Sequence, residues 1–249
     1  MKKGIVLAGG RGTRLLPWTK NLNKHAALVY DKPMVLYPLE TLKSLFIRDI
    51  LLVSGGNHIG WFTEFLGDGH EYGVNLTYKV QEEAGGIAEA LGLARDFVGD
   101  EPVVVILGDN VFDNNNFFQI IPSEDLDPKK AHIFVKEVDD PERFGVLNPD
   151  GSIEEKPKEP KSNKAITGIY IYPPSVFDIV STLKPSDRGE LEISHVNNEF
   201  IRRGQMEVHE ITGFWSDAGQ FDSLLKSALW AQKLQHKNNQ KGSFSSLDK

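Results

Sequence analysis

A glycine-rich, basic segment follows the first apolar run of the chain. From Leu7 the sequence reads LAGGRGTRLLPWTKNLNK, with glycines at positions 9, 10 and 12 and basic side chains at 11, 14, 20 and 24. Glycines let successive backbone N–H groups line an anion, and arginine and lysine side chains add positive charge for phosphate oxygens. The segment predicts a phosphate-binding loop, although by itself it also fits a surface turn with hydrated basic side chains.

Two common phosphate loops do not match this segment. The dinucleotide-binding fingerprint needs a third glycine where Leu15 stands. The P-loop needs glycine, lysine and a hydroxyl residue where this chain has Gly12, Thr13 and Arg14. A dehydrogenase with a variant nucleotide loop is therefore disfavoured.

Two aspartates follow short apolar runs in positions that suit a metal ion. Asp109 comes directly after VVVILG, and Asp217 lies in the sequence FWSDAG. Mg²⁺ in proteins is typically held by one or two carboxylates together with phosphate oxygens. A carboxylate that faces the phosphate loop would bind Mg²⁺ in this way. The alternatives are an Asx-turn at Asp109 and a helix N-cap at Asp217.

Charge and composition limit the partners of the chain. Its 249 residues carry 28 Lys and Arg against 35 Asp and Glu, a formal net charge of -7, so we expect no nucleic-acid partner. An anionic ligand must then meet a local basic cluster. The chain has no cysteine, which excludes disulfides and thiolate metal sites and fits a cytoplasmic protein. No apolar segment approaches the roughly 18 residues of a membrane span, so we expect no membrane partner.

Short runs rich in Val and Ile predict strands, and helical patterns separate the early ones. The predicted strands cover residues 4–8, 49–54, 75–80, 103–107, 131–138, 166–172 and 206–211. The predicted helices cover residues 38–46, 87–97, 190–203 and 221–235. This alternation indicates an α/β fold. We expect a Rossmann-like doubly wound, mixed but mainly parallel sheet with helices on both faces and ligands at the carboxyl ends of its strands.

The pattern changes to shorter strands near residue 135. The sequence FGVLNPDGSIEEKP predicts an antiparallel hairpin around residues 148–151. We expect a single domain over residues 1–235, with a small antiparallel addition in its second half. The polar residues 236–249 are expected to form a frayed tail.

Several blocks of the sequence together resemble the sugar-1-phosphate nucleotidyltransferases, and in particular the branch that uses dTTP and glucose 1-phosphate. They include LAGGRGTRLLPWT, YDKPM, KVQEEAGGIAEAL, VVVILGDN, DPERFGV, EEKPKEPKSN, KPSDRGELEI and WSDAG, in the family's order. The resemblance implies transfer of a nucleotidyl group from a nucleoside triphosphate to a sugar 1-phosphate, with Mg²⁺ as cofactor and pyrophosphate as the second product. It also implies a homo-oligomer, a nucleotide-binding half over residues 1–130 and a sugar-phosphate-binding half over residues 131–235.

The resemblance further implies roles for the residues that match the family's motifs. It implies catalytic roles for Arg14, Lys24 and Asp109, and metal binding by Asp109 and Asp217. The implied nucleotide contacts are Leu7, Gly9, Gly10, Gly12, Thr13, Arg14, His25, Gln81 and Gly86. The implied sugar-phosphate contacts are Asn110, Gly145, Glu155, Lys156 and Arg188.

Two alternatives remain open. The amide of Gln81 can pair with the imide edge that thymine and uracil share, so UTP is an alternative to dTTP. The other alternative is a nucleotide-sugar sensor without turnover. A binding module, however, gains little from keeping all of Arg14, Lys24, Asp109 and Asp217.

The segment after Lys24 departs from the family's usual pattern. Ala26, Ala27 and Leu28 stand where bulkier residues and a proline are common. Lost bulk in a packed site leaves a destabilising cavity unless another side chain fills it. We expect Trp18 or Trp61 to fill that space.

Overall fold

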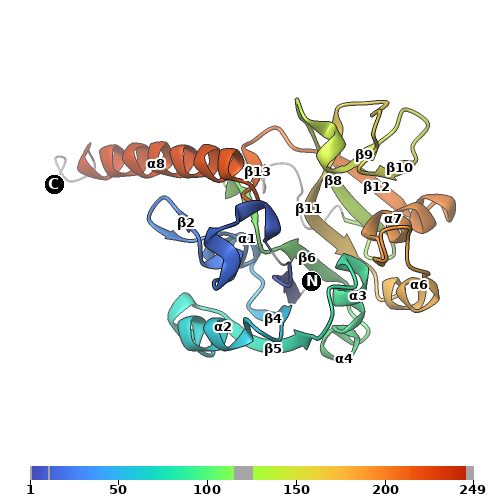
Figure 1. The fold of residues 1–249 in the computed structure, drawn as a ribbon, viewed down its shortest axis with the longest axis horizontal. Helices are drawn as coiled ribbons and strands as arrows, with labels where there is room; N and C mark the ends of the chain where they lie inside the picture. Colours follow the sequence, from blue (N-terminus) through green and yellow to red (C-terminus); the bar gives the residue numbers. More distant parts are fainter. Residues whose placement is uncertain (1, 11, 115–125, 245–249) are drawn as a thin grey trace.

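A nine-stranded sheet forms the centre of the computed structural model, which describes residues 2–10, 12–114 and 126–244 (Figure 1). Its strands follow the order β10-β9-β11-β6-β1-β4-β5, and β8 and β12 continue the sheet from β11. In chain order the strands are β1 (Lys3–Leu7), β4 (Asp49–Gly55), β5 (Asn75–Gln81), β6 (Val103–Leu107), β8 (Ala131–Glu137), β9 (Gly145–Leu147), β10 (Ile153–Glu155), β11 (Lys164–Tyr172) and β12 (Met206–Glu210).

The sheet is mixed, with a parallel centre. β1 runs parallel to both β4 and β6, β4 to β5, and β8 to β12. β11 runs antiparallel to β6 and β8, and β9 and β10 form the predicted antiparallel hairpin. The predicted fold class is therefore confirmed, and each predicted strand is present with ends shifted by a residue or two.

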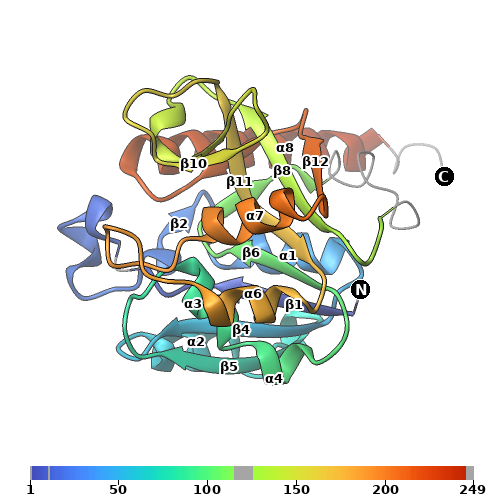
Figure 2. The same ribbon diagram turned by 90° about the vertical axis from the view of Figure 1, so that its right-hand side faces the viewer.

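Helices pack against both faces of the sheet (Figure 1, Figure 2). One face is covered by α1 (Leu36–Ser44) and α2 (Ile59–Leu66). The opposite face is covered by α3 (Ile87–Gly92), α4 (Arg95–Val98), α6 (Val176–Thr182) and α7 (Ile193–Arg202). The last helix, α8 (Phe221–Phe244), runs past β2 and β13 and extends away from the rest of the fold in Figure 1.

The apolar side chains of the central strands alternate between two cores. Ile5 of β1 and Val105 of β6 lie in the core under α3, α6 and α7. Val6 and Ile106, the next residues, lie in the core under α1 and α2. Because successive side chains of a strand point to opposite faces, a strand buried on both sides must be apolar at every position. This explains why the strands appeared as continuous apolar runs in the sequence.

Two short antiparallel ribbons lie outside the central sheet. One pairs β2 (Leu28–Val29) with β3 (Lys32–Pro33). The other pairs β7 (Asn110–Phe112) with β13 (Trp215–Asp217), and its register sets Asp217 opposite Asn110. The second ribbon joins the end of β6 to the segment that enters α8.

Two helix predictions and the prediction of a frayed tail need correction. The helix expected over residues 87–97 is divided into α3 and α4, which separate after Gly92, a residue with poor helix propensity. The helix expected to end at residue 235 continues to Phe244, because HKNNQKGSF contains no proline that would stop it. The expected frayed tail is thus helical to residue 244. Helices α2 and α6 were not predicted.

Length alone does not make α8 a membrane helix. It has 24 residues, and its sequence includes several lysines, glutamines and asparagines. Within the described ranges, no helix combines the length and the apolar character that a membrane crossing requires.

Phe62 provides a test of the packing under α2. Its side chain is fully buried in the core that α1 and α2 cover. We expect Phe62→Ala to lower the free energy of unfolding by about 3–5 kcal/mol, because the lost apolar surface leaves a cavity. The matched control is Phe46→Ala, since Phe46 is 83% exposed and its loss should change stability little. Urea unfolding curves measure both variants, and equal midpoints would contradict the assigned core.

Candidate active site

A cavity of about 820 Å³ opens at the carboxyl ends of β1 and β6. Its lining combines the loop that follows β1, the segment after β6 and residues from the second half of the chain. The edge at which the strands of a doubly wound sheet end is the usual place for a ligand in this fold class. The cavity is therefore the candidate active site.

The loop after β1 is compact because it folds into successive 3-10 turns. They cover Thr13–Leu15, Trp18–Lys20 and Lys24–Ala26. Gly12 has a φ of 64°, and a Cβ there would lie only 3.0 Å from Thr19 and 3.1 Å from Lys24. Thr19 also donates a hydrogen bond of 2.7 Å to the Gly12 carbonyl. Glycine at position 12 thus allows the chain to turn and brings Lys24 back to the start of the loop.

Lys24 forms an ion pair with Asp109. Their strands are neighbours, with Leu7 of β1 opposite Leu107 of β6, so the loops that follow them meet. Lys24 Nζ lies 2.5 Å from Asp109 Oδ2, and the side chains are only 13% and 11% exposed. Burial alone would raise the pKa of Asp109, but the Lys24 ammonium holds this pKa well below its usual value. Asp109 is therefore an ionised carboxylate inside the cavity.

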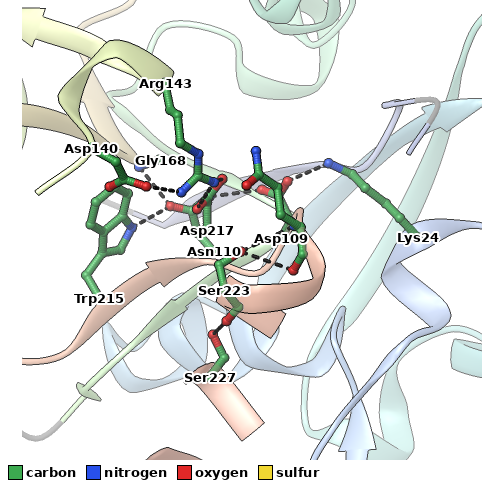
Figure 3. Close-up of polar contacts among 11 residues, drawn as sticks. Lys24, Asp109, Asn110, Asp140, Arg143, Gly168, Trp215, Asp217, Ser223 and Ser227 are labelled. Carbon is green, nitrogen blue, oxygen red and sulfur yellow. Dashed lines mark hydrogen bonds and ion pairs between the residues drawn. The ribbon is translucent and has the colours of Figure 1, made fainter. Parts of the chain in front are cut away.

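Arg143 forms a second ion pair, with Asp217 (Figure 3). Arg143 Nη2 donates to both carboxylate oxygens of Asp217 at 2.8 Å. Burial and the negative charge of Asp109 raise the pKa of Asp217 to about 6, against the opposing effect of Arg143 and Arg14. The two carboxylates therefore share one site, and each has its own cationic partner.

Asn110 fixes the position of Asp109. Its Oδ1 accepts hydrogen bonds from the Gly168 N–H at 2.9 Å and from Trp215 Nε1 at 2.6 Å (Figure 3). Its Nδ2 donates to Asp109 Oδ1 at 2.9 Å. The sequence assigned Asn110 to the sugar phosphate. In the structure its Oδ1 accepts two hydrogen bonds from protein groups and its Nδ2 donates one to Asp109. They give Asn110 a positioning role, and contact with the sugar phosphate stays a prediction.

The residues around Gly219 fit a small divalent cation. A Cβ at Gly219 would lie 3.2 Å from Asp109 Oδ2 and 3.7 Å from both Asp217 Oδ2 and Arg14 Nη2. Two carboxylates thus face a point that glycine leaves open, and their oxygens are the ligands that Mg²⁺ prefers. The arginine beside this point suits the phosphate that usually completes such a site.

A second basic cluster of the cavity lining consists of Lys156 and Arg188. Lys156 Nζ is 3.6 Å from Glu155 Oε1, and Arg188 Nη1 is 3.5 Å from the same oxygen. Lys156 directly follows β10 and has a φ of 46°, a left-handed conformation that is rare for lysine. Its N–H donates to the Phe144 carbonyl at 2.9 Å, which stabilises this turn. The turn places Lys156 in the cavity lining.

Gln81 lines the cavity with its amide oxygen available. Its Nε2 donates to Glu89 Oε2 at 2.5 Å and to the Gly86 carbonyl at 3.3 Å. Its Oε1 faces Gly9, where a Cβ would lie 2.5 Å away. The sequence predicted that this amide could offer both a donor and an acceptor to a base. In the structure its nitrogen is bound to protein, so the acceptor alone is available.

The cavity brings together all but one of the residues assigned from the sequence. The exception is His25, which is 1% exposed and does not belong to the lining. Its Nδ1 and its backbone N–H both lie within hydrogen-bond distance of Asn23 Oδ1. Burial and the neighbouring Lys24 charge lower its pKa to about 3, so the imidazole is neutral. His25 therefore packs behind the cavity lining.

The basic residue at position 11 lies outside the described residues. The assigned residues that line the cavity are Leu7, Gly9, Gly10, Gly12, Thr13, Arg14, Lys24, Gln81, Gly86, Asp109, Asn110, Gly145, Glu155, Lys156, Arg188 and Asp217.

Several residues of the cavity lining were not assigned from the sequence, and three of them, Arg143, Ser194 and Asn197, carry polar groups that suit a role in the site. Arg143 lies in the DPERFGV block, but only its ion pair with Asp217 reveals its role. Ser194 and Asn197 of α7 line the cavity, and Ser194 Oγ and Asn197 Nδ2 are buried without a hydrogen-bond partner among the described residues. Buried polar atoms normally have partners, so these two are suited to meet a ligand.

The space beside Ala27 is not filled by either tryptophan. Ala27 packs in a cluster with Met34, Tyr37 and Ala231 of α8, among others. Trp61 stacks on Phe65 with 5.1 Å between ring centres, and Trp18 is 38% exposed. The expectation for Trp18 or Trp61 was therefore wrong, because the ribbon of β2 and β3 and helix α8 close this space instead.

Paired carboxylates between two basic clusters, at the carboxyl edge of a doubly wound sheet, define an α/β enzyme that handles phosphate groups. A sequence profile described as "Nucleotidyl transferase" matches residues 3–233. Over 244 residues, 95% of this chain and 85% of the relative, the chain is 41% identical to a glucose-1-phosphate thymidylyltransferase of Neisseria meningitidis serogroup A. It is also 41% identical to one of Xanthomonas campestris pv. campestris, over 94% of this chain and 82% of that relative. The chain belongs to the nucleotidyl transferase family and is an enzyme.

Solved structures agree with this assignment. A Bacillus anthracis protein, provisionally assigned as a glucose-1-phosphate thymidylyltransferase and solved with sucrose, superposes with a TM-score of 0.83 at 47% identity, over 93% of this chain and 95% of that one. A UDP-glucose pyrophosphorylase bound to UDP-glucose gives a TM-score of 0.80 at 22% identity, over 94% and 99%. The second likeness supports the fold alone.

A methyl group placed at Gly219 tests whether the reaction uses the space beside this residue. The methyl group of Gly219→Ala would stand 3.2 Å from Asp109 Oδ2, in the space that a cation or phosphate needs. We expect nucleotidyl transfer to fall about 10–100-fold, because small displacements of reacting groups have effects of this size. The melting temperature should stay near that of the wild type. The control is Gly60→Ala in α2, where a Cβ would meet nothing within 4 Å. A wild-type rate in Gly219→Ala would show that neither a cation nor a phosphate needs the space beside Gly219.

Proposed function

We propose that the protein transfers the thymidylyl group of dTTP to glucose 1-phosphate, giving dTDP-glucose and pyrophosphate. The observation that carries the proposal is one cavity that holds the paired carboxylates Asp109 and Asp217 together with two basic clusters. The clusters are Arg14 with Lys24, and Lys156 with Arg188. Each basic cluster suits one phosphate-bearing substrate. The names of the relatives from Neisseria and Xanthomonas support this choice of substrates.

The reaction needs little help with proton transfer, but it requires the protein to neutralise a large negative charge. A phosphate oxygen of the sugar phosphate attacks the α-phosphorus of the triphosphate, and the bond to the bridging oxygen of pyrophosphate breaks. Pyrophosphate leaves with the electron pair of that bond. The attacking oxygen is already an anion, so it needs no strong general base. The protein must instead bring two polyanions into line and neutralise their charge.

The nucleotide half of the cavity supplies the groups for the triphosphate. In this proposal Gly9, Gly10, Gly12 and Thr13 surround its phosphates. Arg14 binds the departing pyrophosphate. Lys24 contacts the phosphates at the reaction centre from its position beside Asp109, 2.5 Å from Oδ2. Preorganised charges of this kind stabilise the negative charge that develops in the transition state.

We assign Mg²⁺ to Asp109 and Asp217, since members of this family generally use a divalent metal ion and both ligands are carboxylates. When bound, it would supply positive charge to the phosphate oxygens of the reacting group. Lys24 and Arg143 balance the negative charge of the two carboxylates in the structure. Asn110 holds Asp109 in its orientation through the hydrogen bond from Nδ2.

Base recognition relies on the oxygen of Gln81. Because Glu89 and Gly86 bind its nitrogen, Gln81 presents Oε1 as an acceptor. Thymine and uracil carry an imide N–H that can donate to this oxygen, whereas cytosine has an acceptor at that position. The methyl group of thymine would then lie among apolar side chains of the lining, which include Leu7 and Ile87.

The sugar half of the cavity contains both charged and neutral polar groups. In our proposal Lys156 and Arg188 bind the sugar phosphate, and Glu155 accepts hydrogen bonds from sugar hydroxyls. Ser194 Oγ and Asn197 Nδ2 are further candidates for hydroxyl contacts, because both are buried in the lining without a partner. Gly145 leaves room beside Glu155, whose Oε2 would be 3.5 Å from a Cβ there.

Residues 1–130 and 131–235 thus act as the nucleotide and sugar-phosphate halves of one domain in this proposal. We further propose a homo-oligomer in the cytoplasm. The partly exposed side chains of Phe221, Leu225 and Leu229 support an oligomer, since they recur every four residues on α8 and form an apolar stripe.

Two substitutions test the catalytic assignment. We expect Arg14→Ala and Asp109→Ala each to lower turnover by about 10²–10³-fold, because each removes an electrostatic group from the reacting phosphates. The fold should remain intact. The control is Lys20→Ala, since Lys20 is exposed and does not belong to the cavity lining. Pyrophosphate release measures the rates, and near-normal turnover in either variant would remove that residue from the mechanism.

A comparison of nucleotides tests the proposed substrates. We expect kcat/KM for dTTP to exceed that for UTP about tenfold, because one buried methyl group discriminates by about 1–3 kcal/mol. CTP should be far poorer than UTP, since its ring nitrogen would face Gln81 Oε1 without a hydrogen atom between them. Pyrophosphate release with dTTP, UTP, CTP, ATP and GTP, each with several sugar 1-phosphates, measures these ratios. UTP above dTTP would favour the uridylyl alternative, and no turnover with any pair would contradict the proposed function.

A further inference from the structure

Two histidines and a glutamate lie together on β8 and β12, the strand pair at one edge of the sheet. β12 pairs in parallel with β8, and Glu207 lies opposite His132 in their register. His209 follows Glu207 by two residues, so both side chains leave β12 on the face from which His132 leaves β8. None of the three residues belongs to the lining of the active-site cavity. The cluster is therefore separate from Asp109 and Asp217.

The donor atoms of these side chains are spaced like ligands of a single metal ion. His132 Nδ1 lies 3.1 Å from His209 Nε2 and 3.4 Å from Glu207 Oε2. All three donor atoms lie within 4.8 Å of one another. Tetrahedral zinc, with bonds of about 2.0–2.2 Å, places neighbouring donors roughly 3.3–3.6 Å apart. The two measured separations are close to this range, and a small rotation of the partly exposed Glu207 or His209 can adjust the third.

The hydrogen bond of His132 to a backbone carbonyl leaves its Nδ1 available to bind a metal ion. His132 is 1% exposed, and its Nε2 lies 3.0 Å from the Asp127 carbonyl. A carbonyl oxygen only accepts, so Nε2 carries the proton and Nδ1 presents a lone pair to the cluster. Histidines that bind metals commonly donate their other N–H to a carbonyl in this way, which fixes the tautomer and the ring.

Glu207 is held in an orientation that also suits a shared ion. Lys130 Nζ donates to Glu207 Oε1 at 2.8 Å, so the other oxygen, Oε2, faces His132. The ring of His209 stacks on Phe134 on one side, with 5.2 Å between ring centres. Each of the three side chains thus has a neighbour that orients it without using its donor atom.

We propose that His132, Glu207 and His209 bind one divalent transition-metal ion, with Zn²⁺ favoured and a water molecule as the fourth ligand. Two imidazole nitrogens with one carboxylate favour Zn²⁺ over Mg²⁺ and Ca²⁺, which prefer oxygen ligands. The bound ion joins β12 to β8 and stabilises the edge of the sheet, because binding to the folded chain alone stabilises it.

Calorimetry on the full chain tests this site. Chelator-treated protein is titrated with Zn²⁺ in excess Mg²⁺, which occupies Asp109 and Asp217. We expect one Zn²⁺ per chain, and His209→Ala and Glu207→Gln should each weaken its binding at least tenfold. Asp217→Asn should leave this binding unchanged, as should His195→Ala, which removes an exposed histidine of α7. Thermal unfolding should show a rise of several degrees with Zn²⁺ in the wild type and little rise in His209→Ala.

The fold of the variants is checked by their activity. Nucleotidyl transfer with Mg²⁺ should be unchanged in His209→Ala, because the cluster lies outside the cavity. Zn²⁺ binding that both cluster variants leave within twofold of the wild type would overturn the proposal. Failure of the Mg²⁺-loaded wild type to bind Zn²⁺ would also overturn it, and would identify the 3.1 Å contact as a hydrogen bond between two imidazoles.

Discussion

The pairing of β7 with β13 is the constraint on which the active site depends. Through this register Asp217 lies opposite Asn110, beside Asp109, so two carboxylates enter one partly desolvated cavity. Carboxylates in one site repel each other, and burial adds a desolvation penalty. Lys24 and Arg143 offset both effects, one on each carboxylate. The glycine-rich loop and the DPERFGV segment are therefore bound to the ribbon electrostatically, and substrates meet a site whose charges are already positioned.

The parts of the fold that the sequence predicted are those set by local pattern. Strands buried on both faces are continuous apolar runs, as in VVVIL, and all the predicted strands are present. The phosphate loop was visible for a similar reason, because its glycines and basic residues lie within one short segment. Helix α2 was missed although Phe62 and Leu66 recur at helical spacing, because its eight residues, IGWFTEFL, repeat the pattern over only two turns. The end of α8 was misplaced because polar composition alone does not stop a helix.

The parts that the sequence did not predict depend on contacts between distant residues. Arg143 and Asp217 are 74 residues apart, and nothing near either residue indicates the pair. Asn110 receives its hydrogen bonds from residues 58 and 105 positions away, so its positioning role appears only in three dimensions. His25 matched a family motif, but it is buried behind the lining. A motif therefore predicts that a residue lies near the chemistry, whereas burial and tertiary contacts determine whether it can touch a substrate.

The opposite pKa shifts of the two aspartates follow from their different partners. Asp109 has a lysine at 2.5 Å and an amide donor from Asn110, and its pKa is lowered. Asp217 lies near that fixed negative charge, and its pKa is raised even though Arg143 binds both of its oxygens. The negative charge of Asp109 therefore makes ionisation of Asp217 harder, and added positive charge favours it. Two carboxylates that repel each other in this way are suited to a divalent cation. The repulsion that opposes folding then favours ligand binding, which explains why such a costly arrangement is compatible with function.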